Sequence, residues 1–186
     1  TLTTMTGATA SIIGAGAIGR ATATRLHALG MRVLGMKRTP EPLPGFDEVL
    51  GPDGLDTLLE QADLLVIACP LTPETEHMIG REQFARMKSS AVIVNIARGA
   101  VMVEEDLIDA LKTGVIAGAG LDVFTTEPLP PDNRLWSLPN VIVTPHVSYL
   151  AGENEAAMLD EFGENLRLYL EGEPLLNALK SRELGY

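Results

Sequence analysis

Cysteine is almost missing from this chain, which has one, Cys69, among its 186 residues. A single cysteine excludes an intramolecular disulfide and argues against a cysteine-based metal site. The sequence also lacks an apolar run long enough to span a membrane and a basic-then-apolar leader. We therefore expect a cytoplasmic protein with no metal site and no membrane partner.

Positive charge is scarce as well. The chain has 14 Lys and Arg residues against 25 Asp and Glu residues, which gives a net charge of −11. A nucleic-acid partner is not expected, because such a surface usually needs a basic stripe. An anionic substrate would have to be bound by local cations against the overall field.

Hydrophobic residues make up 46% of the chain and charged residues 21%, which is typical of a globular domain with a sizeable core. Apolar runs alternate with helical patterns, and several runs are apolar on successive residues, as in parallel strands covered on both faces. This alternation predicts an α/β fold with a doubly wound parallel sheet. Segments 38–52 and 125–138 are expected to be irregular. The expected strands are 8–13, 32–36, 64–68, 91–96, 116–123 and 141–143, and the expected helices are 17–29, 55–61, 81–87, 104–113 and about 153–170.

A glycine-rich turn stands between the first expected strand and the first expected helix. Gly14, Gly16 and Gly19 have the spacing Gly-x-Gly-x-x-Gly. In this context the first glycine permits a tight turn, the second lets the backbone approach a pyrophosphate, and the third lets helix pack on strand. The pattern predicts a Rossmann-type dinucleotide-binding domain over residues 1–170, followed by a C-terminal tail over residues 171–186.

Three ionisable residues stand just past the ends of three late strands. Arg98, Glu127 and His146 follow the strands expected at 91–96, 116–123 and 141–143. Ligands of open α/β sheets bind outside the carboxyl ends of the strands. An arginine can bind a carboxylate through two parallel hydrogen bonds, and a histidine with a carboxylate partner can move a proton. The trio predicts hydride transfer to or from a carbonyl acid.

Four strings carry a resemblance to a known family. They read Asn-Ile-Ala-Arg-Gly at 95–99, Leu-Asp-Val-Phe-x-x-Glu-Pro-Leu at 121–129, Leu-Trp-x-x-Pro-Asn-Val-x-x-Thr-Pro-His at 135–146, and Cys-Pro-Leu-Thr-Pro-Glu-Thr at 69–75. They resemble the signatures of the D-isomer-specific 2-hydroxyacid dehydrogenases. The resemblance implies that Arg98 orients the substrate and that Glu127 and His146 form the proton relay.

The same resemblance implies contacts with NAD or NADP. Ala17 and Ile18 would approach the pyrophosphate, Ile96 would contact the cofactor through its backbone, and Asp122 would hold the nicotinamide carboxamide. Another three residues would line the adenosine side: Cys69, Pro70 and Thr75. With the glycine turn, the expected cofactor-binding residues are Gly14, Gly16, Ala17, Ile18, Gly19, Lys37, Arg38, Thr39, Cys69, Pro70, Thr75, Ile96, Ala97, Arg98, Asp122, His146 and Ser148.

The second strand indicates which dinucleotide is preferred. An NAD-binding domain usually carries an acid there to hold the ribose hydroxyls. This chain has Lys37, Arg38 and Thr39 instead. Cations and a hydroxyl would bind a 2′-phosphate that a carboxylate would repel. We therefore expect NADP to be preferred over NAD, although two solvated cations at a strand end would give the same pattern.

Plainer interpretations of the site residues stay open at this point. Arg98 could form a surface ion pair, and Glu127 and His146 could be ordinary loop and turn residues. Asp122 could be a buried carboxylate that accepts from a backbone amide. Cys69 is expected to be a small buried hydrophobe and not a nucleophile.

Members of this family usually carry a substrate domain built from both ends of the chain, and we expect it to be largely absent from this sequence. We expect the tail at 171–186 to be its return segment, and the 186-residue chain alone to be nearly inactive. The expected activity is reduction of a small 2-keto acid such as glyoxylate or hydroxypyruvate, by a homodimer. A dinucleotide-sensing corepressor or scaffold and an enzyme like formate dehydrogenase are the alternatives, and Glu127 counts against the latter.

Overall fold

The computed structural model describes residues 4–149 and 154–178. It consists of two compact units, Thr1–Pro145 and His146–Tyr186. The boundary expected at residue 170 stays a prediction.

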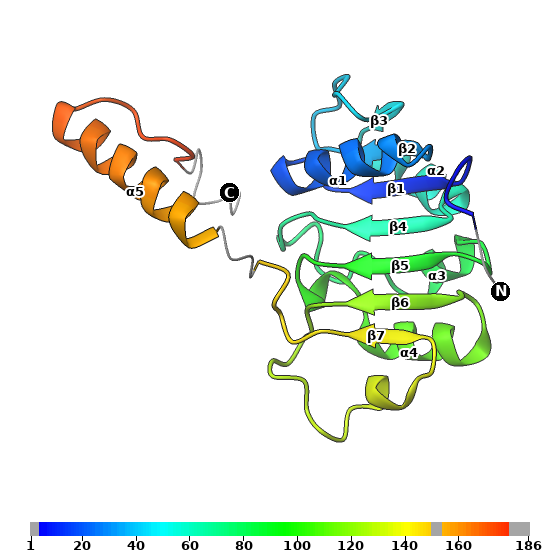
Figure 1. The fold of residues 1–186 in the computed structure, drawn as a ribbon. Helices are drawn as coiled ribbons and strands as arrows, with labels where there is room; N and C mark the ends of the chain where they lie inside the picture. Colours follow the sequence, from blue (N-terminus) through cyan, green and yellow to red (C-terminus); the bar gives the residue numbers. More distant parts are fainter. Residues whose placement is uncertain (1–3, 150–153, 179–186) are drawn as a thin grey trace. The chain divides into compact units, whose positions relative to one another are not determined.

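The first unit contains a seven-stranded sheet in the order β3-β2-β1-β4-β5-β6-β7. All six neighbouring pairs are parallel, so the carboxyl ends of the strands share one edge, at the arrowheads in Figure 1. The expected parallel sheet is confirmed. The strands are β1 (Thr9–Ile13), β2 (Arg32–Met36), β3 (Glu48–Leu50), β4 (Leu64–Ile67), β5 (Val92–Asn95), β6 (Gly118–Leu121) and β7 (Val141–Val143).

Helices cover both faces of this sheet (Figure 1). On one face α1 (Ala17–Ala28) packs Ala23 and Leu26 against β1, β2 and β4. On the other face lie α2 (Leu55–Gln61), α3 (Arg81–Arg86) and α4 (Glu104–Thr113), which form the larger apolar core. Each helix presents an apolar side to the sheet, which is where most of its stability comes from.

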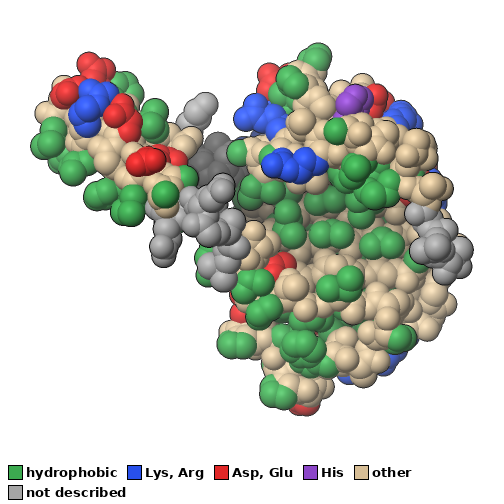
Figure 2. All heavy atoms as spheres, in the orientation of Figure 1, with side chains coloured by type: hydrophobic (Ala, Val, Ile, Leu, Met, Phe, Trp, Pro, Cys, Tyr) green, Lys and Arg blue, Asp and Glu red, His purple; other side chains and the backbone are tan. Residues whose placement is uncertain are grey.

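The α1 side of the sheet is open over β5 to β7 among the described residues of the first unit. Hydrophobic side chains lie at the surface of this face below α1 (Figure 2). Ile142 of β7 is 72% exposed and Val92 of β5 is 37% exposed. In this unit, strands β5 to β7 are therefore covered by helices on one face only.

The second unit contains α5 (Asn154–Glu171), whose described side chains include an exposed apolar set. Its members are 48–76% exposed: Met158, Leu159, Phe162, Leu166, Tyr169 and Leu170. Neither this helix nor any other in the described residues is long and apolar enough to cross a membrane.

Two segments that we expected to be irregular contain short regular elements. Strand β3 forms within 38–52, because three residues of that segment pair with β2. A 3₁₀ helix, η3 (Arg134–Ser137), forms within 125–138. The side chain of Asn133 accepts a hydrogen bond from the N–H of Leu135 and so caps η3.

Candidate active site

The glycine turn between β1 and α1 packs as tightly as its spacing predicts. Gly14 has a φ of +104°, and a Cβ there would lie 2.6 Å from the nitrogen of Cys69, in the loop after β4. A Cβ on Gly19 would lie 2.0 Å from the carbonyl oxygen of Gly14. Because neither position can hold a side chain, two of the three glycines are required by the fold itself.

Gly16 differs from its two neighbours in the motif. A Cβ at this position would meet nothing within 4 Å, and its φ of −79° is one that any residue adopts. The open space lies at the N-terminus of α1, where no side chain caps the helix and the first turn has no acidic residue. Free N–H groups and the helix dipole at such an end favour a phosphate. These residues therefore fit the diphosphate of a dinucleotide.

The turn that carries Arg98 is fixed by a buried asparagine at the end of β5. Asn95 has no exposed surface. Its side-chain amide donates to the carbonyl oxygen of Arg98 at 2.9 Å, and its side-chain oxygen accepts from the N–H of Ala97 at 3.0 Å. The two bonds hold the backbone on both sides of the arginine, while the arginine side chain is exposed.

The loop that carries Glu127 packs closely against the turn that follows β5 and carries Arg98. A Cβ on Gly99 would lie 2.0 Å from the carbonyl carbon of Phe124, so the two backbones touch. Within its own loop, the Glu127 carboxylate accepts the N–H of Phe124 at 2.9 Å. The structure therefore brings the segments of Arg98 and Glu127 together at the carboxyl edge, beyond β5 and β6.

Asp122 lies between these segments, directly after β6, and is 4% exposed. Thr144, beyond β7, donates its hydroxyl to the Asp122 carboxylate. A buried carboxylate that accepts hydrogen bonds can orient a donor amide. The predicted contact with a nicotinamide carboxamide stays a prediction.

His146 is the first residue of the second unit and follows Thr144 and Pro145 at the end of β7. Its φ is +55°, an uncommon conformation for a residue with a side chain, and its ring contacts that of Tyr149 edge-on. Backbone held in this region often marks a functional position. The pairing of the His146 imidazole with the Glu127 carboxylate stays a prediction. The contact of Ser148 with the cofactor stays a prediction as well.

The loop after β4, at the expected adenosine side, is closed by Thr75. The hydroxyl of Thr75 donates to the carbonyl oxygen of Pro70 at 2.7 Å and accepts from the N–H of Thr72 at 2.8 Å. Cys69 at the start of this loop is 7% exposed, and burial raises the pKa of its thiol to about 11. The thiol is therefore protonated near neutral pH, which supports the interpretation as a small buried hydrophobe. The described residues contain no cluster of His, Cys, Asp and Glu that could hold a metal ion.

Lys37, Arg38 and Thr39 follow β2 at the same edge of the sheet, with Lys37 partly buried and the other two exposed. The ammonium of Lys37 pairs with the carboxylate of Glu41, four residues on. That hydrogen bond, together with the nearby charges of Lys37 and Arg20, lowers the pKa of Glu41. The sequence spacing alone did not reveal this contact.

A parallel sheet with an open glycine turn at a helix N-terminus and polar loops at one edge is typical of a dinucleotide-binding domain. Comparison with known proteins gives the family. Residues 1–148 match the family described as "D-isomer specific 2-hydroxyacid dehydrogenase, NAD binding domain". The chain belongs to this family.

Curated relatives have names that agree with this assignment. The chain is 42% identical over 164 residues to a hydroxypyruvate reductase of Blautia hydrogenotrophica, an alignment covering 88% of the chain and 51% of the relative. It is 44% identical over 172 residues to a glyoxylate reductase of Korarchaeum cryptofilum, covering 90% of the chain and 50% of the relative. The chain thus spans about half the length of the curated relatives it matches.

A solved structure has the same fold. It is the NADPH-dependent glyoxylate/hydroxypyruvate reductase of Sinorhizobium meliloti in complex with NADP and sulfate. The TM-score is 0.89 at 35% identity, over 96% of this chain and 57% of that chain. The expected fold is confirmed, and this chain spans little more than half of that chain.

Reasoning from the sequence missed the residues that hold the site residues in place. Asn95 and Thr144 both occur in the motif strings, but we assigned neither a role. A polar residue at the end of an apolar strand is a usable signal for Asn95, since a buried amide needs partners. Nothing comparable in the sequence points to the contact between Glu41 and Lys37.

Proposed function

We propose that the protein containing this chain is an NADPH-preferring D-2-hydroxyacid dehydrogenase. Its substrate would be a small 2-keto acid, with glyoxylate and hydroxypyruvate as the first candidates. The backbone contact between Gly99 and Phe124 carries the proposal, because it brings the segments that contain Arg98 and Glu127 together at the carboxyl edge of the sheet, the edge at which the glycine turn also lies. The names of the relatives support the substrate class.

The residues have separate tasks in this proposal. Arg98 binds the substrate carboxylate through paired hydrogen bonds and orients the keto group. His146, protonated, donates its proton to the keto oxygen, and Glu127 holds the imidazole in the required tautomer. The bound nicotinamide supplies the hydride. In the reverse direction neutral His146 accepts the hydroxyl proton.

The cofactor preference rests on the end of β2. Lys37 and Arg38 offer two cations where an acid would bind a ribose hydroxyl. The solved relative with bound NADP supports the choice. The same proposal includes a cytoplasmic location, which the single cysteine favours. It also includes a homodimer, because the apolar residues of α5 are exposed.

The test is a panel of 2-keto acids with the full-length protein that contains this chain, read as NADPH oxidation. Arg98→Ala is expected to reduce kcat/KM by at least about a hundredfold, because the substrate carboxylate loses its partner. Arg134→Ala is the matched control, since Arg134 is an arginine that pairs with Glu105 at the surface. Full activity of Arg98→Ala, or no turnover of any small 2-keto acid by the unmodified protein, would contradict the proposal.

A further inference from the structure

In the segment after β2, the carboxylate of Glu41 lies against Lys37, the lysine that we expect to bind the 2′-phosphate of the cofactor. Glu41 and Lys37 form an ion pair on the same loop. Arg20, in the first turn of α1, is close enough to act on the charge of Glu41. The Glu41 carboxylate therefore lies beside Lys37, one of the cations that we expect to bind the cofactor phosphate, and within reach of the charge of Arg20.

The loop that presents Glu41 is anchored. Pro40, Pro42 and Pro44 alternate with the other loop residues, and each proline fixes its own φ near −65°. The loop is tied at its far end, because Gly45 has a φ of +83° and a Cβ there would lie 3.0 Å from the nitrogen of Thr24 in α1. Glu41 is thus carried by a restricted backbone and not by a freely moving tether.

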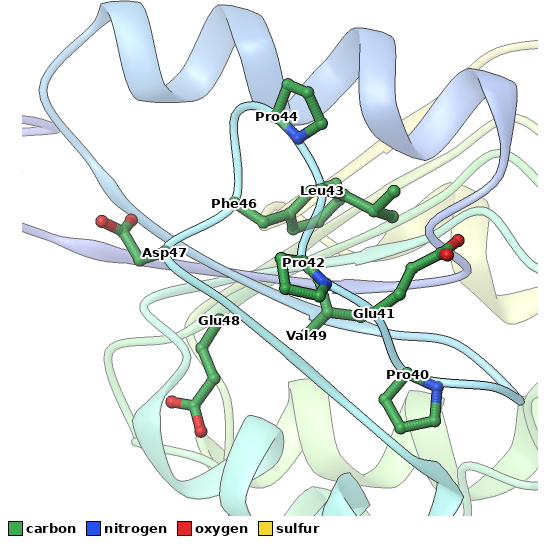
Figure 3. Close-up of a pocket in the computed structure, with 9 residues that line it drawn as sticks. All are labelled: Pro40, Glu41, Pro42, Leu43, Pro44, Phe46, Asp47, Glu48 and Val49. Carbon is green, nitrogen blue, oxygen red and sulfur yellow. The ribbon is translucent and has the colours of Figure 1, made fainter.

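A second tie holds the loop to the sheet. The ring of Phe46 lies on β2, where a Cβ on Gly35 would come within 2.6 Å of it. The N–H of Val33 also donates to the Asp47 carboxylate at 2.7 Å. An open hollow of about 550 Å³ is lined by this segment, and Figure 3 shows Glu41 pointing away from Asp47 and Glu48.

We propose that Glu41 is an internal competitor of the cofactor 2′-phosphate for Lys37. The proposal rests on the NADPH preference proposed above. A lysine is a compact point charge that can serve either anion. Glu41 must therefore release Lys37 before the phosphate can bind, and it lowers the affinity for NADP relative to NAD.

The proposal assigns Glu41 to specificity and not to the chemical step. Removing its charge should strengthen the binding of ligands with a 2′-phosphate and leave other adenine nucleotides unchanged. The effect depends on Lys37, so it should disappear when Lys37 is removed.

The test is calorimetric titration of this chain with adenosine 2′,5′-bisphosphate and with 5′-AMP. Glu41→Gln is expected to tighten binding of the bisphosphate by roughly two- to fivefold, the modest range expected for an exposed ion pair. Binding of 5′-AMP should not change. Glu48→Gln is the matched control, because Glu48 lines the same hollow but pairs with Arg32.

The double variant Lys37→Ala with Glu41→Gln should bind the bisphosphate no more tightly than Lys37→Ala alone. An unchanged or weaker affinity of Glu41→Gln, an equal gain for 5′-AMP or for Glu48→Gln, or a gain that persists without Lys37 would overturn the proposal.

The failure of this proposal can be distinguished from the failure of the proposed function. If Lys37→Ala weakens binding of the bisphosphate but Glu41→Gln does nothing, only the competitor is wrong. If the unmodified chain binds neither nucleotide, the proposed function fails as well.

Discussion

Gly16 differs from the other two glycines of the turn, because the packing of the fold does not require a glycine at this position. Gly14 and Gly19 have no room for a side chain, whereas a Cβ on Gly16 would enter open space. The open side of Gly16 is where the backbone is expected to meet the diphosphate. A substitution at this position therefore tests binding without damaging the core.

We expect Gly16→Ala to change the free energy of unfolding by less than about 0.5 kcal/mol, as surface substitutions usually do. Its Kd for NADPH should rise by about tenfold or more, because a methyl group would occupy the diphosphate position. Thermal unfolding and fluorescence titration measure the two effects. Gly163→Ala in α5, also in open space, is the control that should leave NADPH binding unchanged. Unaltered NADPH binding by Gly16→Ala would contradict the assignment of this turn.

The sequence predicts a candidate site residue only where its side-chain type and its position at a strand end are unusual. Arg98 and Glu127 are candidates from the sequence because charged residues stand out at strand ends, and their roles stay predictions. The hydrogen bonds of Asn95 and the pairing of Glu41 with Lys37 depend on side-chain rotamers and on loop paths. Spacing in the sequence does not determine these.

Among the elements, the loop between α2 and β4 is joined to two others through Asp63. Its carboxylate accepts from the N–H of Thr9 at the start of β1 and from the ammonium of Lys88, which precedes β5, both at 2.8 Å. Burial alone would raise the pKa of Asp63, but the bonds from Lys88 and Thr9 outweigh it and lower the pKa. The ionised form is thus the one that stabilises the fold.

Asp63→Asn is expected to lower the free energy of unfolding at neutral pH by about 1–2 kcal/mol, through loss of charge-assisted hydrogen bonds. A lowered folded-state pKa contributes stability above the unfolded value of about 3.9, and this stability is lost as pH falls through the folded value. Urea unfolding from pH 7 down to pH 3 should therefore show a steeper loss for the unmodified chain than for Asp63→Asn. Parallel pH profiles would refute the role of this carboxylate.

Most elements could be predicted because apolar runs and helix signals are local. The helix expected at 104–113 is found as Glu104–Thr113, with an acidic first turn and Gly114 in the left-handed conformation at its end. Strand β3 was missed because three partly exposed residues carry no period, and their pairing with β2 is a tertiary effect. The strand expected at 116–123 is observed as Gly118–Leu121, two residues shorter at each end.

For the molecule as a whole, the positive charge of Lys37 and Arg38 at the end of β2 bears most directly on the choice between NADPH and NADH. Against a net charge of −11, local cations must bind the anionic cofactor. We expect kcat/KM of the full-length protein to be at least about tenfold higher with NADPH than with NADH, since a charge-assisted contact to a 2′-phosphate contributes that much. Lys37→Asp should reverse the order. A preference of the unmodified protein for NADH would overturn this part of the proposal.

The most direct measurement of the proposed site is a crystal structure of the full-length protein with NADPH and an unreactive analogue of a 2-keto acid. The account predicts that Arg98 binds the carboxylate of the analogue. It also predicts that His146 lies within about 3.2 Å of the oxygen at the reacting carbon, with Glu127 on its other ring nitrogen. An analogue bound elsewhere, or a His146 ring remote from both Glu127 and the nicotinamide, would contradict it.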